Sequence, residues 1–304
     1  MKAVQITGYG GPGMIVVGQA PVPEPAPGQV RVRVAAAGLN PVDWKIREGQ
    51  MREVLPQAFP ITLGAELAGI VEATGSGVRE FAVGDEVHGG TGAIGALAEM
   101  ALVDVSALAK KPQGMSMPVA AALPVAVATA TAALNAGGVS QGTRLLVQAA
   151  AGGVGHIAVQ LALGRGAEVT ALASPDNFGF VKNLGVDRII DRTAPLAARQ
   201  GSYDVVIAAF GAPPGDMIWG HLNKGGTLVT LLPPAPEEHA ASIGARAVFA
   251  LGTPIGADLE AADALVLAGK LRPIIAKTVG IESVNDAMAE VEAGKVRGKI
   301  VVTF

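Results

Sequence analysis

The sequence predicts an α/β fold with two domains, one rich in short antiparallel strands and one doubly wound around a parallel sheet. Half of the 304 residues are hydrophobic, which is enough for sizeable buried cores. Short alternating segments punctuated by Gly and Pro fill residues 1–116, whereas Ala-rich helical stretches alternate with apolar strands from about Val119 onward. We expect residues 1–116 and 270–304 to form the β-rich domain and residues 117–269 to form the parallel one.

The β-rich domain is predicted from alternation of apolar and polar residues. The cleanest strands are expected at 30–36 and 68–74, and the segment GSGVREFAVGD supplies turn residues between two later strands. Such a pattern is typical of an antiparallel, partly barrel-shaped sheet. The C-terminal tail has a helical segment at 284–292 and a final strand in GKIVVTF, and we expect it to complete this domain.

The parallel domain is predicted from compact apolar strands separated by helical stretches. We expect these strands at 144–149, 168–173, 188–190, 204–209, 227–232 and 247–251. Their spacing implies right-handed βαβ units with helices on both faces of the sheet, and a further helix is expected at 259–268. The most hydrophobic stretch, 117–135, contains Pro124 and two threonines, so we interpret it as a buried helix and not as a membrane span.

Charge and composition exclude several classes of function. The net charge of -3 arises from 23 basic and 26 acidic residues with no basic run, so we expect no nucleic-acid partner. The N-terminus has no apolar signal region, which favours a cytoplasmic protein. The chain has no cysteine, and its four histidines have no metal-ligand spacing. We therefore predict no metal site and no membrane partner.

The segment LLVQAAAGGVGHIAVQLALGRG, residues 145–166, reads as a buried strand, a glycine turn and a helix. This is the phosphate-binding unit of a Rossmann fold. Gly152 and Gly155 occupy the second and third glycine positions of G-x-G-x-x-G, and Ala150 takes the first. Val154 and the helix N-terminus offer backbone N–H groups to a diphosphate. The alternative is a strand-to-helix turn of the same composition that binds no ligand.

The end of the second parallel strand predicts which dinucleotide is bound. Leu172, Ala173 and Ser174 stand where an NAD-preferring site places a carboxylate, so NADPH is favoured. Ser174, Asn177 and Arg192 are candidates for the 2′-phosphate, with Arg192 as the fixed positive charge. Asp176 favours NADH instead, because its carboxylate would repel a 2′-phosphate. A solvated surface residue is an almost equally good interpretation of Arg192.

Several motifs occur in an order that resembles the zinc-independent quinone oxidoreductase branch of the medium-chain dehydrogenase/reductase superfamily, the group that includes zeta-crystallin. These motifs are AAAGLNPVDWKIREG (35–49), LGAELAGIVEATGSGV (63–78), FAVGDEV (81–87), LPVAVATATAAL (123–134), AAAGGVG (149–155), LGVDRIID (184–191), KGGTLV (224–229) and VRGKIVV (296–302). AAAGGVG matches the branch's A-x-x-G-x-x-G variant at Ala149, Gly152 and Gly155. The resemblance implies a GroES-like catalytic domain beside the Rossmann domain.

The resemblance also implies roles for individual residues. Zinc-containing relatives carry a cysteine near the position of Asn40 and a histidine at that of Ala65, so no catalytic zinc is expected here. Asn40 is implied to lie by the nicotinamide and substrate, and Lys299 to close the cofactor cleft. The family commonly forms dimers by pairing edge strands, which here would be 247–251. The remaining predicted cofactor contacts are Thr129, Ala149, Gly153, Phe210 and Leu251.

The substrate cleft departs from the pattern of the branch. Tyrosines that relatives often carry there correspond to Lys45, Met51 and a position near Met100, and the only tyrosines of this chain are Tyr9 and Tyr203. Stacking of a quinone is therefore less favoured, and a smaller or aliphatic enone is correspondingly more plausible. We expect Asn40, Trp44 and Met51 to contact the substrate, with simple core packing as the alternative for Trp44.

The predicted reaction is transfer of a hydride from NADPH to a quinone or to an α,β-unsaturated carbonyl. Negative charge then accumulates on the carbonyl oxygen, and the Asn40 amide is the predicted donor, with Lys45 or a backbone N–H as substitutes. Asp43 is a candidate general acid, although a helix cap is the more common role for such a carboxylate. Glu66 is interpreted as structural. Two other functions stay open, namely an NADPH-binding protein without turnover and an enoyl-thioester reductase.

Overall fold

The computed structural model describes residues 1–193, 203–213 and 216–304, and the chain divides into two compact units. Unit 1 comprises Met1–Val125, Thr253–Leu267 and Pro273–Phe304, and unit 2 comprises Ala126–Gly252 and Ala268–Arg272. These bounds differ from the predicted domains at three places. Residues 117–125 and 253–267, which include helix α7 (Gly256–Leu267), group with unit 1, whereas the sequence analysis assigned both to the parallel domain. Residues 270–272 group with unit 2 and were assigned to the β-rich domain.

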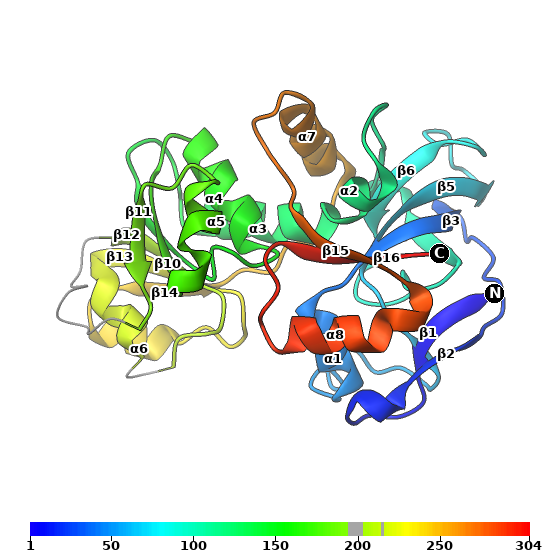
Figure 1. Ribbon diagram of the computed structural model, residues 1–304, viewed down its shortest axis with the longest axis horizontal. Coiled ribbons are helices and arrows are strands. Elements are labelled where there is room, and N and C mark those ends of the chain that lie inside the picture. Colours follow the sequence, from blue (N-terminus) through cyan, green and yellow to red (C-terminus); the bar gives the residue numbers. More distant parts are fainter. Residues whose placement is uncertain (194–202, 214–215) are drawn as a thin grey trace. The chain divides into compact units, whose positions relative to one another are not determined.

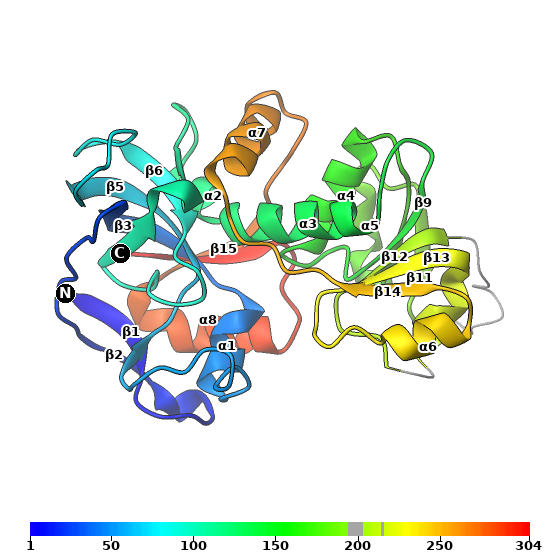
Figure 2. The ribbon, with the colours of Figure 1, turned by 180° about the vertical axis from the view of Figure 1, so that it is seen from behind.

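Unit 1 is built on two sheets, whose strands are drawn mainly in blue, cyan and red (Figures 1 and 2). The small sheet has the order β2-β1-β4, with β1 Lys2–Ile6, β2 Ile15–Gln19 and β4 Ile61–Thr62. The larger sheet has the order β15-β16-β3-β5-β6-β8, and β7 also pairs with β3. Its strands are β3 Gln29–Gly38, β5 Glu66–Thr74, β6 Glu86–Gly90, β7 Met100–Asp104, β8 Leu108–Lys110, β15 Ile275–Gly280 and β16 Lys299–Thr303.

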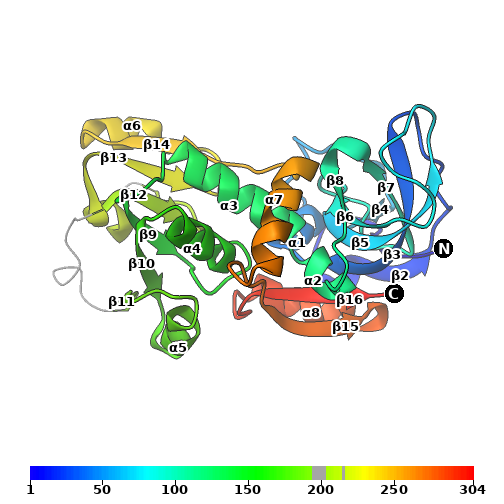
Figure 3. The ribbon, with the colours of Figure 1, turned by 90° about the horizontal axis from the view of Figure 1, so that it is seen from above.

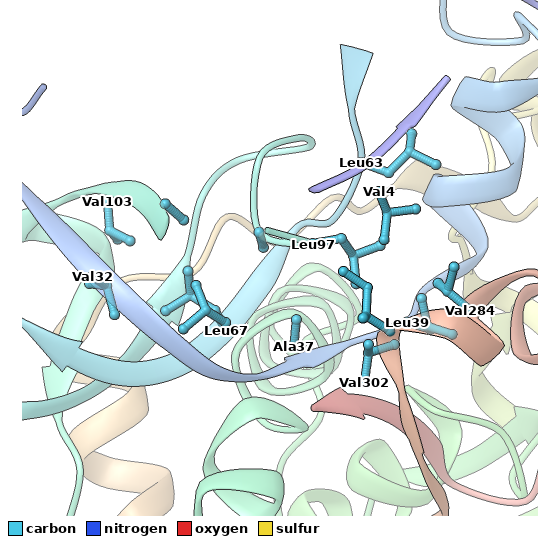
Figure 4. Close-up of a cluster of buried hydrophobic side chains, with 14 of the residues drawn as sticks. Val4, Val32, Ala37, Leu39, Leu63, Leu67, Leu97, Val103, Val284 and Val302 are labelled. Atoms are coloured by element: carbon cyan, nitrogen blue, oxygen red, sulfur yellow. The ribbon is translucent and has the colours of Figure 1, made fainter. Parts of the chain in front are cut away.

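Alternation along β3 explains how this sheet buries one face. Val30, Val32 and Val34 are buried, whereas Arg31 between them reaches Glu24 and Glu72 at the surface. The buried valines join a cluster drawn from β1, β3, β5, β7, β16 and α8 (Figure 4). The predicted strands 30–36 and 68–74 lie inside β3 and β5, which confirms the antiparallel β-rich domain.

Helices of unit 1 are short except for the last two. They are α1 Pro41–Arg47, α2 Met117–Ala121, α7 Gly256–Leu267 and α8 Val284–Glu292, with 3-10 turns η1 Pro12–Met14, η2 Val105–Ala107 and η6 Ile281–Ser283. Helix α8 has the predicted bounds, because its apolar residues recur with helical spacing and bury Val284, Ala287 and Met288.

Unit 2 contains one parallel six-stranded sheet of order β11-β10-β9-β12-β13-β14, visible as neighbouring arrows in Figure 3. Its strands are β9 Arg144–Gln148, β10 Glu168–Ala173, β11 Arg188–Asp191, β12 Tyr203–Ala208, β13 Leu222–Thr230 and β14 Arg246–Phe249. This is the strand order of a Rossmann fold, with the direction of winding reversing between β9 and β12. The helical elements are α3 Pro124–Ala136, α4 Gly155–Gly164, η3 Pro175–Asn177, α5 Phe178–Lys182, η5 Met217–His221 and α6 Glu237–Ser242.

The apolar stretch 117–135 is two helices, and the expectation of one helix is wrong. Helix α2 ends at Ala121 and α3 begins at Pro124. Proline lacks the N–H that a continuing helix needs and disfavours helical geometry in the preceding residue, whereas it is well suited to the first position of a new helix. In the part of the chain that the structure describes, no helix is long and apolar enough to cross a bilayer.

Candidate functional site

The turn between β9 and α4 is tightly folded around the carbonyl of Ala149. Ala149 has φ +55°, and its oxygen accepts a hydrogen bond from the Gly152 N–H at 2.8 Å. A Cβ on Gly155 would lie 2.1 Å from that oxygen, so only glycine fits there. The sequence analysis gave the first position of the motif to Ala150, but the left-handed residue of the turn is Ala149.

The first turn of α4 presents backbone donors. Among the described residues, the N–H groups of Gly153, Val154 and Gly155 have no hydrogen-bond acceptor, and Gly153 and Val154 are partly exposed. Unpaired N–H groups and the positive end of a helix favour an anion. The turn therefore fits the diphosphate of a dinucleotide.

The predicted 2′-phosphate residues gather at the same carboxyl edge of the sheet. Ser174 follows β10, and its Oγ accepts a hydrogen bond from Asn177 Nδ2 at 3.1 Å. The backbone N–H of Arg192, just after β11, donates to Ala173 O at 2.9 Å. The Arg192 side chain is exposed and forms no ion pair with any residue that the structure describes.

The other predicted cofactor contacts of unit 2 lie where later strands end. Phe210 follows β12, is 62% exposed and donates its N–H to Gln148 Oε1 at 3.2 Å. Leu251 follows β14 and is 72% exposed. A Cβ on the next residue, Gly252, would lie 2.4 Å from the backbone nitrogen of Thr129 in α3, so the residue after Leu251 packs against the backbone at Thr129.

Unit 1 contains a buried polar network centred on Lys299, Asn40 and Glu66. The Lys299 ammonium, on β16, donates to Leu39 O at 3.0 Å, to Asn40 Oδ1 at 2.6 Å and to Glu66 Oε1 at 2.5 Å. The second Glu66 oxygen accepts the Val125 N–H at 2.7 Å. Lys299, Asn40 and Glu66 are all at most 5% exposed. All three ammonium protons are used, so this ion pair is fully satisfied.

The Asn40 amide is fully occupied by protein partners. Its Nδ2 donates to Glu66 Oε1 at 2.8 Å and to Gly38 O at 3.3 Å, while its Oδ1 accepts from Lys299. An Asn40 donor to a substrate oxygen must therefore give up one of these two bonds. Likewise, the Lys299 ammonium, predicted to close the cofactor cleft, is directed into unit 1.

Asp43 acts as a cap on α1. Its carboxylate accepts the N–H of Asn40 at 2.7 Å and that of Gly64 at 3.0 Å, which links the start of α1 to the loop before β5. Burial raises the pKa of this carboxyl to about 7, partly offset by those two N–H donors and by Lys299. The sequence analysis gave two roles for Asp43, a general acid and a helix cap, and these contacts are those of a helix cap.

Lys45, in the last turn of α1, is a charged side chain that forms no ion pair with any residue the structure describes. It is half-buried, and burial lowers the pKa of its ammonium because no carboxylate of the described residues lies within ion-pair distance. Its Nζ lies 5.7 Å from the centroid of the Trp44 ring. Trp44 and Met51 both pack against the core of unit 1 while remaining partly exposed.

Sequence reasoning missed that Glu66 and Lys299 form one network with Asn40. A signal was present, because GAELAG and GKIVVTF each place one charge in an otherwise apolar strand. A charge at such a position is almost never buried without a partner of opposite sign.

Comparisons with known proteins place this fold and site in a family. Residues 26–113 match the alcohol dehydrogenase GroES-like domain, and residues 184–302 match the zinc-binding dehydrogenase domain. The chain is 36% identical to the chloroplast envelope quinone oxidoreductase homolog of Arabidopsis thaliana, over 99% of this chain and 98% of that protein. The chain belongs to the quinone oxidoreductases of the medium-chain dehydrogenase/reductase superfamily.

Other members of the superfamily are similar to nearly the whole of this chain. The 2-methylene-furan-3-one reductase of Solanum lycopersicum is 32% identical over 99% of this chain and 79% of its own length. The solved quinone oxidoreductase from Coxiella burnetii superposes with a TM-score of 0.92 at 32% identity, covering 100% of this chain and 99% of that one. This medium-chain enzyme is an NAD(P)H-dependent oxidoreductase.

The residues of this medium-chain enzyme do not fit the zinc that the name of the second matched domain suggests. Within residues 1–193, 203–213 and 216–304, no three side chains of His, Asp or Glu are arranged to hold a metal ion, and the chain has no cysteine. The resemblance implies that Asn40 and Ala65 stand where zinc-containing relatives carry ligands. Both carboxylates near them are already engaged, Glu66 by Lys299 and Asp43 by the N–H groups of Asn40 and Gly64.

Proposed function

We propose that the protein is an NADPH-dependent, zinc-independent reductase of quinones or α,β-unsaturated carbonyls. The observation that carries this proposal is the β9–α4 turn. Gly155 has no room for a Cβ there, and the unpaired N–H groups of Gly153, Val154 and Gly155 would favour binding of an anion such as a diphosphate. Bound NADPH supplies a hydride to the acceptor. An activated double bond or a quinone suits this site, because without a metal ion an isolated carbonyl is only weakly polarised.

The preference for NADPH rests on charge at the carboxyl edge of the sheet. Residues 172–174 offer no carboxylate to repel a 2′-phosphate. The backbone N–H of Arg192 donates to Ala173 O, so this exposed arginine starts from the same edge of the sheet as residues 172–174. Ser174 and Asn177 supply further polar groups.

The protein's contribution to chemistry is to stabilise charge on the carbonyl oxygen of the acceptor. We assign this role to Lys45, because its half-buried ammonium has no carboxylate partner to neutralise it. Asn40 remains a candidate donor. It is the N-cap of α1, and Lys45 lies in the last turn of the same helix. The proton that completes the reduction comes from Lys45 or from water.

Assembly and location belong to the same proposal. We expect a homodimer formed through the edge strand β14, whose outer side has no strand partner among the described residues. A cytoplasmic location is kept as a prediction from the sequence, although the Arabidopsis relative is named for the chloroplast envelope.

Cofactor titration and turnover test the proposal together. NADPH should bind at least ten-fold more tightly than NADH, and Arg192→Ala should weaken NADPH without changing NADH, because only NADPH carries the 2′-phosphate. Oxidation of NADPH should occur with quinones or enones in a panel that also contains a CoA-bound enone. Binding without oxidation of any of them, or equal affinity for the two cofactors, would contradict the proposal.

The role of Lys45 is tested by the pH dependence of turnover. If the ammonium is required, kcat/KM should fall as pH rises through the lowered pKa of Lys45, because deprotonation removes the positive charge. Lys45→Arg should keep activity at higher pH, and Lys45→Met should reduce kcat by about ten-fold or more at pH 7. The exposed Lys224→Met variant is the control. Unchanged kcat in Lys45→Met would refute the assignment.

A further inference from the structure

We propose that His88 and Asp263 share one buried proton that attaches helix α7 to unit 1, and that loss of this proton at alkaline pH releases the helix. The pair gives the fold a contact that is sensitive to pH. All of its groups lie within unit 1, and the inference does not depend on the proposed function.

Both ring nitrogens of His88 face oxygen atoms. His88, on β6, is 0% exposed, with Nε2 2.9 Å from Asp263 Oδ2 on α7 and Nδ1 3.1 Å from Ala120 O on α2. A carbonyl oxygen only accepts hydrogen bonds, so Nδ1 carries a hydrogen. A neutral imidazole would then turn the lone pair of Nε2 toward an ionised carboxylate oxygen, and the two would repel each other. The contact between Nε2 and Oδ2 therefore requires a second proton between them.

The buried carboxyl of Asp263 depends on this proton. Asp263 is 3% exposed, and its other oxygen, Oδ1, has no hydrogen-bond partner among the described residues. An ionised carboxylate is costly to bury unless it is paired and hydrogen-bonded. The ring of His88 supplies that pairing. Loss of the shared proton would leave the carboxylate without a side-chain donor in the part of the chain that the structure describes.

The second half of α7 depends on this pair for its attachment. The helix packs against β8 and η2, and its buried residues are Leu259, Ala262 and Asp263. None of residues 264–267 is buried, and Leu267 is 61% exposed. Burial of apolar area therefore contributes little beyond Ala262. The bond to His88 is what fixes this end of the helix.

Other charged groups on the surrounding elements are either engaged or in contact with solvent. Glu66 on β5 lies diagonally across from His88 on the same face, because Ala68 pairs with His88 and Glu66 with Gly90. Glu66 is engaged by Lys299. Helix α2 and η2 carry no charged residue. The remaining charged residues of these elements are at least partly exposed, namely Glu72, Glu86, Lys110, Lys111, Asp258 and Glu260.

Counting protons gives the direction of the pH effect. An imidazole in water changes its charge between about pH 5 and 8 and is neutral above that range. The attached pair then binds one proton more than the two separated side chains. Attachment is therefore fully favoured at lower pH and weakens as pH rises. One proton corresponds to a rise of about ten-fold per pH unit in the opening constant, the ratio of released to attached α7.

Hydrogen–deuterium exchange of the full chain measures this opening constant. Protection factors of residues 260–267, corrected for the intrinsic exchange rate at each pH, should fall about ten-fold per unit between pH 8 and 9.5. Protection in α8 should change less than about two-fold per unit and serves as the internal reference. The chosen range lies above the pKa of about 7 to which burial raises the Asp43 carboxyl on α1.

Variants of the pair separate the shared proton from ordinary packing. Asp263→Asn keeps the contact without the extra proton, because its amide N–H can donate to Nε2 of a neutral imidazole. Residues 260–267 should then stay protected, with a change below about two-fold per pH unit. His88→Leu combined with Asp263→Leu removes both charges and should give the same flat profile, also where the first variant fails to fold. Glu260→Gln, at an exposed position of α7, is the control and should keep the slope of the parent chain. A flat profile for the parent chain, or an equally steep one for Asp263→Asn, would overturn the inference.

Discussion

Removing the Lys299 ammonium should strongly destabilise unit 1. Lys299→Met deletes three charge-assisted hydrogen bonds and leaves the Glu66 carboxylate, 0% exposed, with only the Asn40 Nδ2 and Val125 N–H donors. Breaking one partner out of a buried pair costs about 3–5 kcal/mol. That is a large part of the roughly 5–15 kcal/mol by which domains are stable.

The double variant measures how much of that cost comes from the unpaired charge. Glu66→Gln alone leaves a buried ammonium without its carboxylate and should also cost about 3 kcal/mol or more. In Lys299→Met with Glu66→Gln no charge remains, so the combined loss should be about 1–3 kcal/mol and not the sum of the two. The coupling between the two sites should then be at least about 3 kcal/mol.

Urea unfolding followed by tryptophan fluorescence provides the assay. The chain has two tryptophans, Trp44 in unit 1 and Trp219 in unit 2, so a Trp219→Phe background leaves Trp44 as a reporter of unit 1 alone. The free energy of unfolding is compared for the four members of the cycle. A loss below about 1 kcal/mol in Lys299→Met, or a double variant as unstable as the sum of the single ones, would refute the reasoning.

Two further predictions concern unit 2. Ala149→Gly should raise Tm by about 2 °C in scanning calorimetry, because glycine adopts φ +55° without the roughly 1 kcal/mol cost of a Cβ, and an unchanged or lower Tm would contradict the assigned turn. The Arg144 guanidinium lowers the pKa of Asp204 to about 2, below its ordinary 3.8, so the stability it contributes is present above pH 4 and lost as pH falls towards 2. Both side chains are nearly half exposed, so Asp204→Asn should cost at most about 1 kcal/mol at pH 7. The cost should be clearly smaller at pH 2, where about half of the Asp204 carboxyl is protonated in the folded protein. Urea titrations with Asp187→Asn as the unpaired control test this, and an equal loss at both pH values would contradict it.

Local patterns were sufficient to predict most of the architecture. The strand 168–173 and the helix 284–292 have the predicted bounds, because their periods of apolar residues are read directly from neighbouring positions. The glycine turn was also predictable, since a strand and a helix joined this closely leave no space for a side chain at Gly155. The break at Pro124 could have been predicted from the same local rules but was not.

The sequence by itself determined the two kinds of sheet, the glycine turn between β9 and α4 and the absence of cysteine ligands. Only the tertiary structure decided that Lys299 meets Glu66 across 233 residues, that Asn40 is occupied by both of them, and that His88 meets Asp263. The physical reason is the range of the interactions. Periodicity and turn chemistry act between near neighbours, whereas the pairing of a buried charge or a ring depends on the path of the whole chain.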